Sequence, residues 1–64
     1  PPARFLLQQR MHKACRMLAS TRDPIHEIAR AVGFDDEFYF SRCFRRHLGV
    51  PPREYRRACQ LRGL

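Results

Sequence analysis

Long apolar runs are absent from this 64-residue sequence, and no stretch approaches the roughly 20 residues that a helix needs to span a bilayer. Pro1 and Pro2 open the chain without the basic and apolar pattern of a secretory signal. Cysteine is scarce: Cys15, Cys43 and Cys59 form an odd, widely spaced set without a C-x-x-C pair, whereas small secreted scaffolds usually have an even number. We therefore expect a soluble cytoplasmic protein whose thiols are reduced and mostly buried.

Acidic residues are also in short supply. Six Asp and Glu residues stand against 13 Lys and Arg residues, which gives a formal charge of +7 and an isoelectric point near 10.7. The hydrophobic share of 44% is that of a folded chain, and 64 residues are enough for one small domain with a marginal core. This charge makes polyanions the first partners to consider.

Strand-like alternation, low complexity and convincing repeats are missing, and the sequence predicts an all-α fold of four short helices. The first helix, residues 3–20, follows a proline pair, because proline suits the start of a helix but not its interior. It ends near Ser20, where a polar loop begins. Its apolar residues form one stripe: Leu7, Met11, Ala14, Cys15 and Leu18.

The second predicted helix begins with Asp23 as the N-cap acceptor and Pro24 at the first helical position. Gly33 follows its last apolar residue, where a left-handed backbone conformation closes a helix at little cost. Phe34 can then turn back into the core. The expected buried face is Ile25, Ile28, Ala29 and Val32.

A third helix is predicted from residue 37 to residue 48, capped by Asp36 and ended by Gly49. Its apolar face is expected to point inward and consists of Phe40, Cys43, Phe44, His47 and Leu48. The opposite face carries Phe38, Ser41, Arg42 and Arg45. A proline pair then opens a last helix over residues 52–61, whose inward residues are Tyr55, Ala58, Cys59 and Leu61.

Residues 24–48 fit a helix-turn-helix unit. Ala29 is small enough to let the second helix cross the first closely, and Gly33 permits the sharp turn between them. The outward face of the second helix is then free to enter a DNA major groove, which is about 12 Å wide and accepts one α-helix. Because a basic helix face is more often only solvated, this interpretation depends on spacing, turn glycine and net charge together.

Five side chains of the third helix are candidates for reading bases. Arg42 and Arg45 can bind guanine O6 and N7 or grip phosphates, and Ser41 can donate or accept a hydrogen bond. Phe38 can contact a thymine methyl group. Glu37 can accept from a cytosine amine, or it can be only a partner of the helix dipole that repels phosphate.

Six further residues are candidates for phosphate contacts: Arg30, Tyr39, Arg46, Arg53, Arg56 and Arg57. Three of them lie at the start and middle of the last helix, where free amides and the helix dipole favour an anion. Tyr39 has two interpretations, since it can fill the edge of the core or offer its hydroxyl to a phosphate. A merely solvated basic face is the alternative for the arginines.

Other kinds of site find less support. No nucleophile, base and orienting group can be assembled and no glycine-rich phosphate loop is present, so we expect no enzymatic activity and no cofactor. Cys43 and His47 have the i, i+4 spacing of metal ligands, but their place on the apolar face favours burial over a metal site. The alternative function is a helical interaction module that docks an acidic protein, with RNA polymerase as one candidate.

The pattern IAxxxGFxDxxYFSRxFRR over residues 28–46 is followed by GxxPxxYR over residues 49–56. These residues are similar to the second helix-turn-helix of the AraC/XylS family of bacterial transcription regulators. The pattern PxxFLxxxRMxxAxxML over residues 2–18 is similar to its linker helix. Together these patterns cover nearly the whole chain.

The resemblance implies sequence-specific binding to double-stranded DNA by a homeodomain-like helix-turn-helix preceded by a linker helix. Residues 3–20 would form the linker, residues 24–48 the helix-turn-helix and residues 52–61 a bracing helix. The recognition helix would start after Asp36, with contacts from Glu37, Phe38, Ser41, Arg42 and Arg45. Family members typically carry two such units, so we expect half of the DNA-binding domain of a nucleoid-associated regulator, without the first unit or an N-terminal sensor or dimerisation domain.

Two positions depart from the family pattern. Pro51 stands where the family often has a capping serine, so the last helix lacks a side-chain acceptor at its start. Phe38 stands where many relatives have a small polar residue, which favours an apolar contact over a hydrogen-bonded one.

Overall fold

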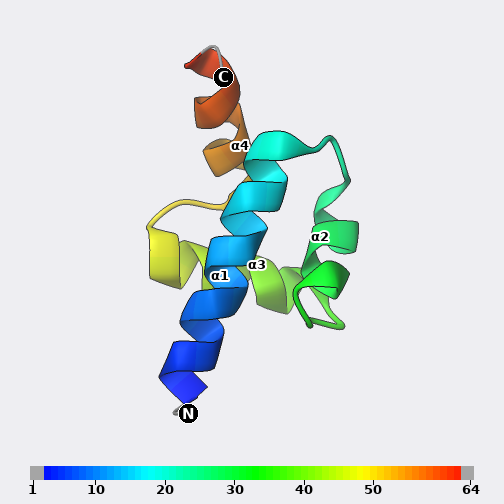
Figure 1. Ribbon diagram of the computed structural model, residues 1–64, viewed down its shortest axis with the longest axis vertical. Coiled ribbons are helices and arrows are strands. Elements are labelled where there is room, and N and C mark those ends of the chain that lie inside the picture. The colour runs from blue at the N-terminus through cyan, green and yellow to red at the C-terminus, as the bar shows by residue number, and fades with distance from the viewer. Residues whose placement is uncertain (1–2, 63–64) are drawn as a thin grey trace.

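The computed structural model describes residues 3–62, and every regular element in this range is a helix (Figure 1). The helices are α1 (Ala3–Ser20), α2 (Ile25–Ala31), α3 (Glu37–Leu48) and α4 (Pro52–Leu61). The predicted all-α fold of four short helices is confirmed. The proposed role of Pro1 and Pro2 at the start of the first helix lies outside the described residues.

The core lies where the four helices meet. The longest helix, α1, crosses in front of α3, and α2 lies to one side (Figure 1). α4 lies at the C-terminal end of α1 and extends past it (Figure 1). Within residues 3–62, the hydrophobic core cluster consists of Met11, Ala14, Leu18, Ile28, Ala29, Val32, Phe34, Phe40 and Phe44, all of which are buried. Since α1 and α3 bury their apolar faces in this common core, their outward faces point in opposite directions.

The turn between α2 and α3 depends on a glycine, as predicted. Gly33 has a φ of 95°, in the left-handed region that side chains with a Cβ rarely adopt. The next amide, of Phe34, donates to the Ala29 carbonyl at 2.8 Å, and the Phe34 ring is buried. The Arg10 guanidinium of α1 lies over this ring at 5.7 Å from its centroid, and its carbon is 3.2 Å from where a Cβ on Gly33 would stand. This cation thus fixes α1 to the turn.

Both ends of α3 follow the sequence prediction. The Asp36 carboxylate accepts a hydrogen bond from the Phe38 amide at 2.9 Å, which caps the N-terminus. At the other end Gly49 adopts a φ of 90°, and its amide donates to the Arg45 carbonyl at 2.7 Å. α4 starts without a side-chain cap, as expected from Pro51 at its N-cap.

The predicted cap of α2 is wrong by one residue. Pro24, and not Asp23, is the N-cap residue, with extended backbone angles and no side-chain cap bond. The Pro24 carbonyl accepts the first helical hydrogen bond, from the Ile28 amide at 3.2 Å. Asp23 is instead held by its amide, which donates to the Thr21 hydroxyl at 3.3 Å. Proline disfavours a helical backbone at the residue before it, here Asp23. Pro24 itself also has extended backbone angles, so α2 begins only at Ile25.

The apolar faces of α3 and α4 are buried over shorter lengths than predicted. His47 and Leu48 at the end of α3 are exposed, and so is Ala58 of α4. Leu61, which was expected to face inward, is 82% exposed. The last turn of α4 extends past the end of α1, so no neighbouring helix covers it (Figure 1).

Arg56 joins α4 to the end of α1. Its Nε donates to the Leu18 carbonyl at 3.2 Å, and one terminal nitrogen of its guanidinium is buried without a hydrogen-bond partner. The last carbonyls of a helix have no partner within it, so this bond satisfies one of them. The structure therefore gives Arg56 an internal bond in place of a free guanidinium.

We expect Arg56→Ala to destabilise the fold by about 1.5 to 3 kcal/mol, the usual value of a hydrogen bond to a charged group. Urea denaturation followed by circular dichroism measures the change. Arg57→Ala is the matched control, because Arg57 is exposed on the same helix and its loss should change stability by less than about 0.5 kcal/mol. Equal destabilisation by the two substitutions would show that the Leu18 bond contributes nothing.

The three cysteines are free and partly buried. Burial beside Tyr55, at the contact of α1 with α4, raises the pKa of the Cys15 thiol above its ordinary value. Burial raises the pKa of the Tyr55 hydroxyl as well. Both groups stay protonated at neutral pH, which suits a packing role for Cys15 and not a reactive one.

Candidate nucleic-acid interface

α3 turns its basic face outward because its apolar face is fixed in the core. Phe40 and Phe44 are fully buried, and their ring centroids are 5.8 Å apart. This packing sets the rotation of the helix about its own axis. On the opposite side, Phe38 is 78% exposed, and Arg42 and Arg45 are also exposed.

Two adjoining depressions follow the exposed side of α3. The first is lined by Ser41, Arg42, Arg45, Arg46, Gly49 and Pro51. The second is lined by Ile25, Glu37, Phe38, Ser41, Pro51, Pro52 and Arg53. Because Ser41 and Pro51 belong to both, the two depressions form one continuous region, which we call the α3 surface. It holds all five residues predicted to read bases.

The predicted phosphate contacts are divided between this surface and other places. Arg46 and Arg53 lie on the α3 surface. Arg57 lies beside it, since it shares a further depression on α4 with Arg53. Arg56 borders the same depression, but its Nε is bonded to Leu18. Three of the six candidates therefore present cations at or next to the residues predicted to read bases.

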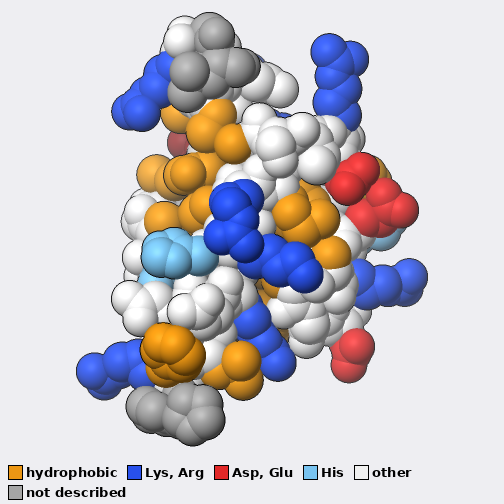
Figure 2. All heavy atoms as spheres, viewed as in Figure 1, with side chains coloured by type: hydrophobic (Ala, Val, Ile, Leu, Met, Phe, Trp, Pro, Cys, Tyr) orange, Lys and Arg blue, Asp and Glu red, His pale blue; other side chains and the backbone are white. Residues whose placement is uncertain are grey.

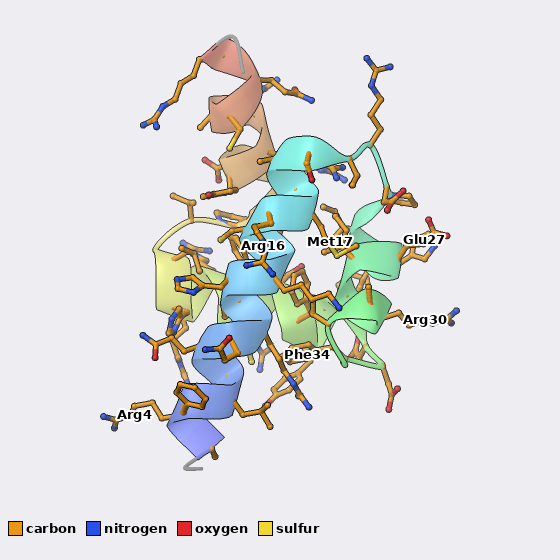
Figure 3. All side chains as sticks on the ribbon, in the orientation of Figure 1. Arg4, Arg16, Met17, Glu27, Arg30 and Phe34 are labelled. Atoms are coloured by element: carbon orange, nitrogen blue, oxygen red, sulfur yellow. The ribbon has the colours of Figure 1, made fainter. Side chains whose placement is uncertain are left out.

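Arg30 and Tyr39 are not among the residues of the α3 surface. Arg30 extends outward from α2, away from α1 (Figure 3). The Tyr39 ring lies 5.8 Å from the Phe34 ring, yet 57% of the residue is exposed. Tyr39 thus packs at the edge of the core while most of its surface stays open.

On the face of the molecule seen in Figure 2, Lys and Arg side chains lie across α1, and most of the visible Asp and Glu side chains lie on the α2 side. On the α1 face, Lys13 donates to the Ala31 carbonyl at the end of α2, at 3.5 Å. This group of cations is separated from the α3 surface by the core.

Cys43 and His47 have metal-ligand spacing on α3, and both were expected to be buried. Cys43 is partly buried, whereas His47 is exposed. Within residues 3–62, no group of three or more His, Cys, Asp or Glu side chains is placed to hold a metal ion. None of the helices in this range is long and apolar enough to cross a membrane.

Known proteins resemble this chain in sequence and in fold. A family model described as a helix-turn-helix domain matches residues 1–58. The arabinose operon regulatory protein of Escherichia coli is 46% identical over 52 residues, which cover 81% of this chain and 18% of that protein. The MmsAB operon regulatory protein of Pseudomonas aeruginosa is 36% identical over 55 residues, 86% of this chain and 18% of that protein.

A solved structure agrees with these relatives. The C-terminal domain of the two-component response regulator yesN from Fusobacterium nucleatum superposes with a TM-score of 0.85 at 41% identity, and the match covers 88% of this chain and 54% of that one. The chain belongs to the AraC/XylS family of transcription regulators.

Membership of the AraC/XylS family confirms the resemblance predicted from the sequence and makes the chain a DNA-binding helix-turn-helix of a transcription regulator. The relatives described above are all named as regulators and come from bacteria. The chain spans 18% of the length of each of the two curated relatives. Activities of the remaining parts of those proteins therefore do not carry over to it.

Sequence reasoning missed two features of this AraC/XylS domain. Arg10 packs on the turn at Gly33, and nothing in the helical pattern distinguishes it from a solvated arginine. Ile25, Pro51 and Pro52 border the α3 surface, although the sequence assigned them only to the core and to a helix start. Their proximity follows from the packing of α2 and α4, which no local signal gives.

Proposed function

We propose that this chain reads DNA sequence with α3 in the major groove. The observation that carries the proposal is the α3 surface, on which one exposed helix face presents every candidate base contact: Glu37, Phe38, Ser41, Arg42 and Arg45. An α-helix with its side chains is about 10 to 12 Å in diameter, so α3 fits a groove about 12 Å wide. Arginine on this face would form paired hydrogen bonds with guanine.

Cations next to this face would fix the position of α3 on the duplex. Arg46, Arg53 and Arg57 are exposed and would bind phosphates, which position a protein without reading sequence. Arg30 and Tyr39, which lie apart, would add peripheral phosphate contacts. We propose no DNA contact for Arg56, because its Nε donates to the Leu18 carbonyl and one of its terminal nitrogens is buried.

The chain would act as half of a two-unit DNA-binding domain in a longer bacterial regulator, on nucleoid DNA in the cytoplasm. The small share of each curated relative that it spans supports this. A first helix-turn-helix and an N-terminal sensor or dimerisation domain would complete the regulator, and RNA polymerase would be a partner of the whole protein. A single module buries about 600 to 1,000 Å² of protein surface on DNA, so the chain alone would bind weakly.

The number of phosphate contacts, measured from the salt dependence of DNA binding, tests this function against the alternative, in which the same basic face docks an acidic protein. Each phosphate contact releases counterions, and log affinity for DNA falls with log salt by about 0.9 per contact. We expect Arg57→Ala to reduce this slope by about 0.9 and to lower affinity equally for all sequences. Fluorescence anisotropy with labelled duplexes between about 50 and 200 mM salt measures both effects.

Lys13→Ala is the matched control, because Lys13 belongs to the α1 face and donates to Ala31. Its slope should equal that of the wild type. Tighter binding to polyglutamate than to DNA, together with a slope that Arg57→Ala leaves unchanged, would favour the acidic-protein alternative and reject the DNA interface.

A further inference from the structure

An apolar rim surrounds the N-terminal end of α3. Phe38 is 78% exposed there, whereas the two other phenylalanines of α3 are completely buried. In the same depression lie Ile25 from the start of α2 and Pro51 and Pro52 from the start of α4. We call these four residues the apolar rim. Three helix starts thus meet at this depression, where Pro52 is buried, Ile25 and Pro51 are half-buried, and Phe38 is the exposed member of the rim.

The apolar rim has little capacity for hydrogen bonding. Phenylalanine, isoleucine and proline side chains have no donor or acceptor, and the prolines also lack a backbone N–H. The Phe38 amide is already bonded to the Asp36 carboxylate at 2.9 Å. A base atom that touches these four side chains can therefore be recognised only by its shape and by apolar contact, whereas the polar groups of the same depression belong to Glu37, Ser41 and Arg53.

The major groove offers one apolar group on the standard bases, the C5-methyl of thymine. The same methyl at the same ring position occurs on 5-methylcytosine. Phe38 is the second residue of α3, and the N-terminal residues of recognition helices are those that contact base edges. Burial of one such carbon increases affinity by about fourfold.

We propose that Phe38 is a specificity-determining residue that recognises the C5-methyl group of a pyrimidine, while the rest of the apolar rim excludes water around that methyl. This inference rests on the proposed function, because it requires α3 to lie in the major groove. Glu37 and Ser41 adjoin the rim and would form hydrogen bonds with polar base edges beside the methyl.

The test removes the methyl group from the DNA. Once the preferred duplex of this chain has been selected from a random pool, each thymine is replaced in turn by deoxyuridine, which lacks only the C5-methyl. Wild type is expected to lose about fourfold in affinity at one position, and Phe38→Ala should lose nothing there. Phe5→Ala is the matched control, since Phe5 is 48% exposed on α1, and it should keep the fourfold loss.

A second arm identifies the source of the methyl. At the same position, duplexes with cytosine and 5-methylcytosine are compared, and a fourfold gain from the added methyl supports readout of either base. A gain from thymine alone supports the proposal with thymine as its ligand. Circular dichroism confirms that both variants are folded.

Two results would overturn the proposal and leave the proposed function intact. One is equal binding of thymine and deoxyuridine duplexes at every position while preferences at other bases persist. The other is a methyl effect that Phe38→Ala does not change, which would assign the contact to another residue. Absence of every sequence preference would instead reject the proposed function itself.

Discussion

Replacing Phe44 by alanine is expected to destabilise the fold by about 3 to 5 kcal/mol, the usual cost of truncating a fully buried phenylalanine. The Phe44 ring lies 5.8 Å from Phe40 within α3 and 5.7 Å from Tyr55 of α4, so the substitution opens the contact between these helices. A domain of 64 residues has a total stability of about 3 to 10 kcal/mol. The variant should therefore lose much of its folded population, and DNA binding with it.

Urea denaturation followed by far-ultraviolet circular dichroism measures this effect. Phe38→Ala is the matched control, because it removes the same ring from the exposed side of the same helix and should change stability by less than about 0.5 kcal/mol. A Phe44→Ala midpoint close to that of the wild type would be incompatible with the packing of α3 described above.

Replacing Arg42 by alanine is expected to have the largest effect on DNA specificity. Arg42 is exposed on the α3 surface, and a guanidinium there can form two hydrogen bonds with guanine O6 and N7. Loss of such a pair should reduce discrimination at one base-pair position by about 5- to 150-fold, equivalent to about 1 to 3 kcal/mol. Affinities for the preferred duplex and its single-base variants give the value directly.

Arg42→Lys separates base reading from simple charge. Lysine keeps the positive charge but lacks the planar fork, so this variant should keep the salt slope of the wild type while discrimination at that position falls. If Arg42→Ala instead weakened binding to all duplexes by one common factor, Arg42 would be a phosphate contact.

Local signals in the sequence predicted most of the fold. Gly33 and Gly49 could be assigned to turns because each must adopt a left-handed backbone, and the structure shows φ values of 95° and 90° there. Asp36 could be assigned as a cap because its short carboxylate reaches the amide two residues on. These turns and this cap depend only on residues close together in the chain, so they can be predicted without knowing how the helices pack.

Features that depend on distant parts of the chain were harder to predict from the sequence. Periodicity placed His47 and Leu61 on apolar faces, but it does not say where the neighbouring helix ends, and both residues are exposed. Arg56 was predicted to contact a phosphate and no partner was predicted for Arg10, yet in the structure Arg56 donates to the Leu18 carbonyl and Arg10 lies over the Phe34 ring. Long side chains have many rotamers, so tertiary packing decides where they go.

The candidate site lies between these two cases. The outward face of α3 could be predicted because the burial of two phenylalanines fixes the rotation of the helix, and the same period gives the opposite face. The apolar rim around Phe38 could not be predicted, since it requires the starts of α2 and α4 to meet beside α3.

Selection of bound duplexes from a random DNA pool, carried out at low salt with wild type and with Arg42→Ala in parallel, tests the central claim most directly. If α3 reads bases in the major groove, the wild-type pool converges on a short shared motif, and the Arg42→Ala pool loses the preference at one position of that motif. A wild-type pool that is retained on the protein but shows no enriched sequence would contradict base reading by α3.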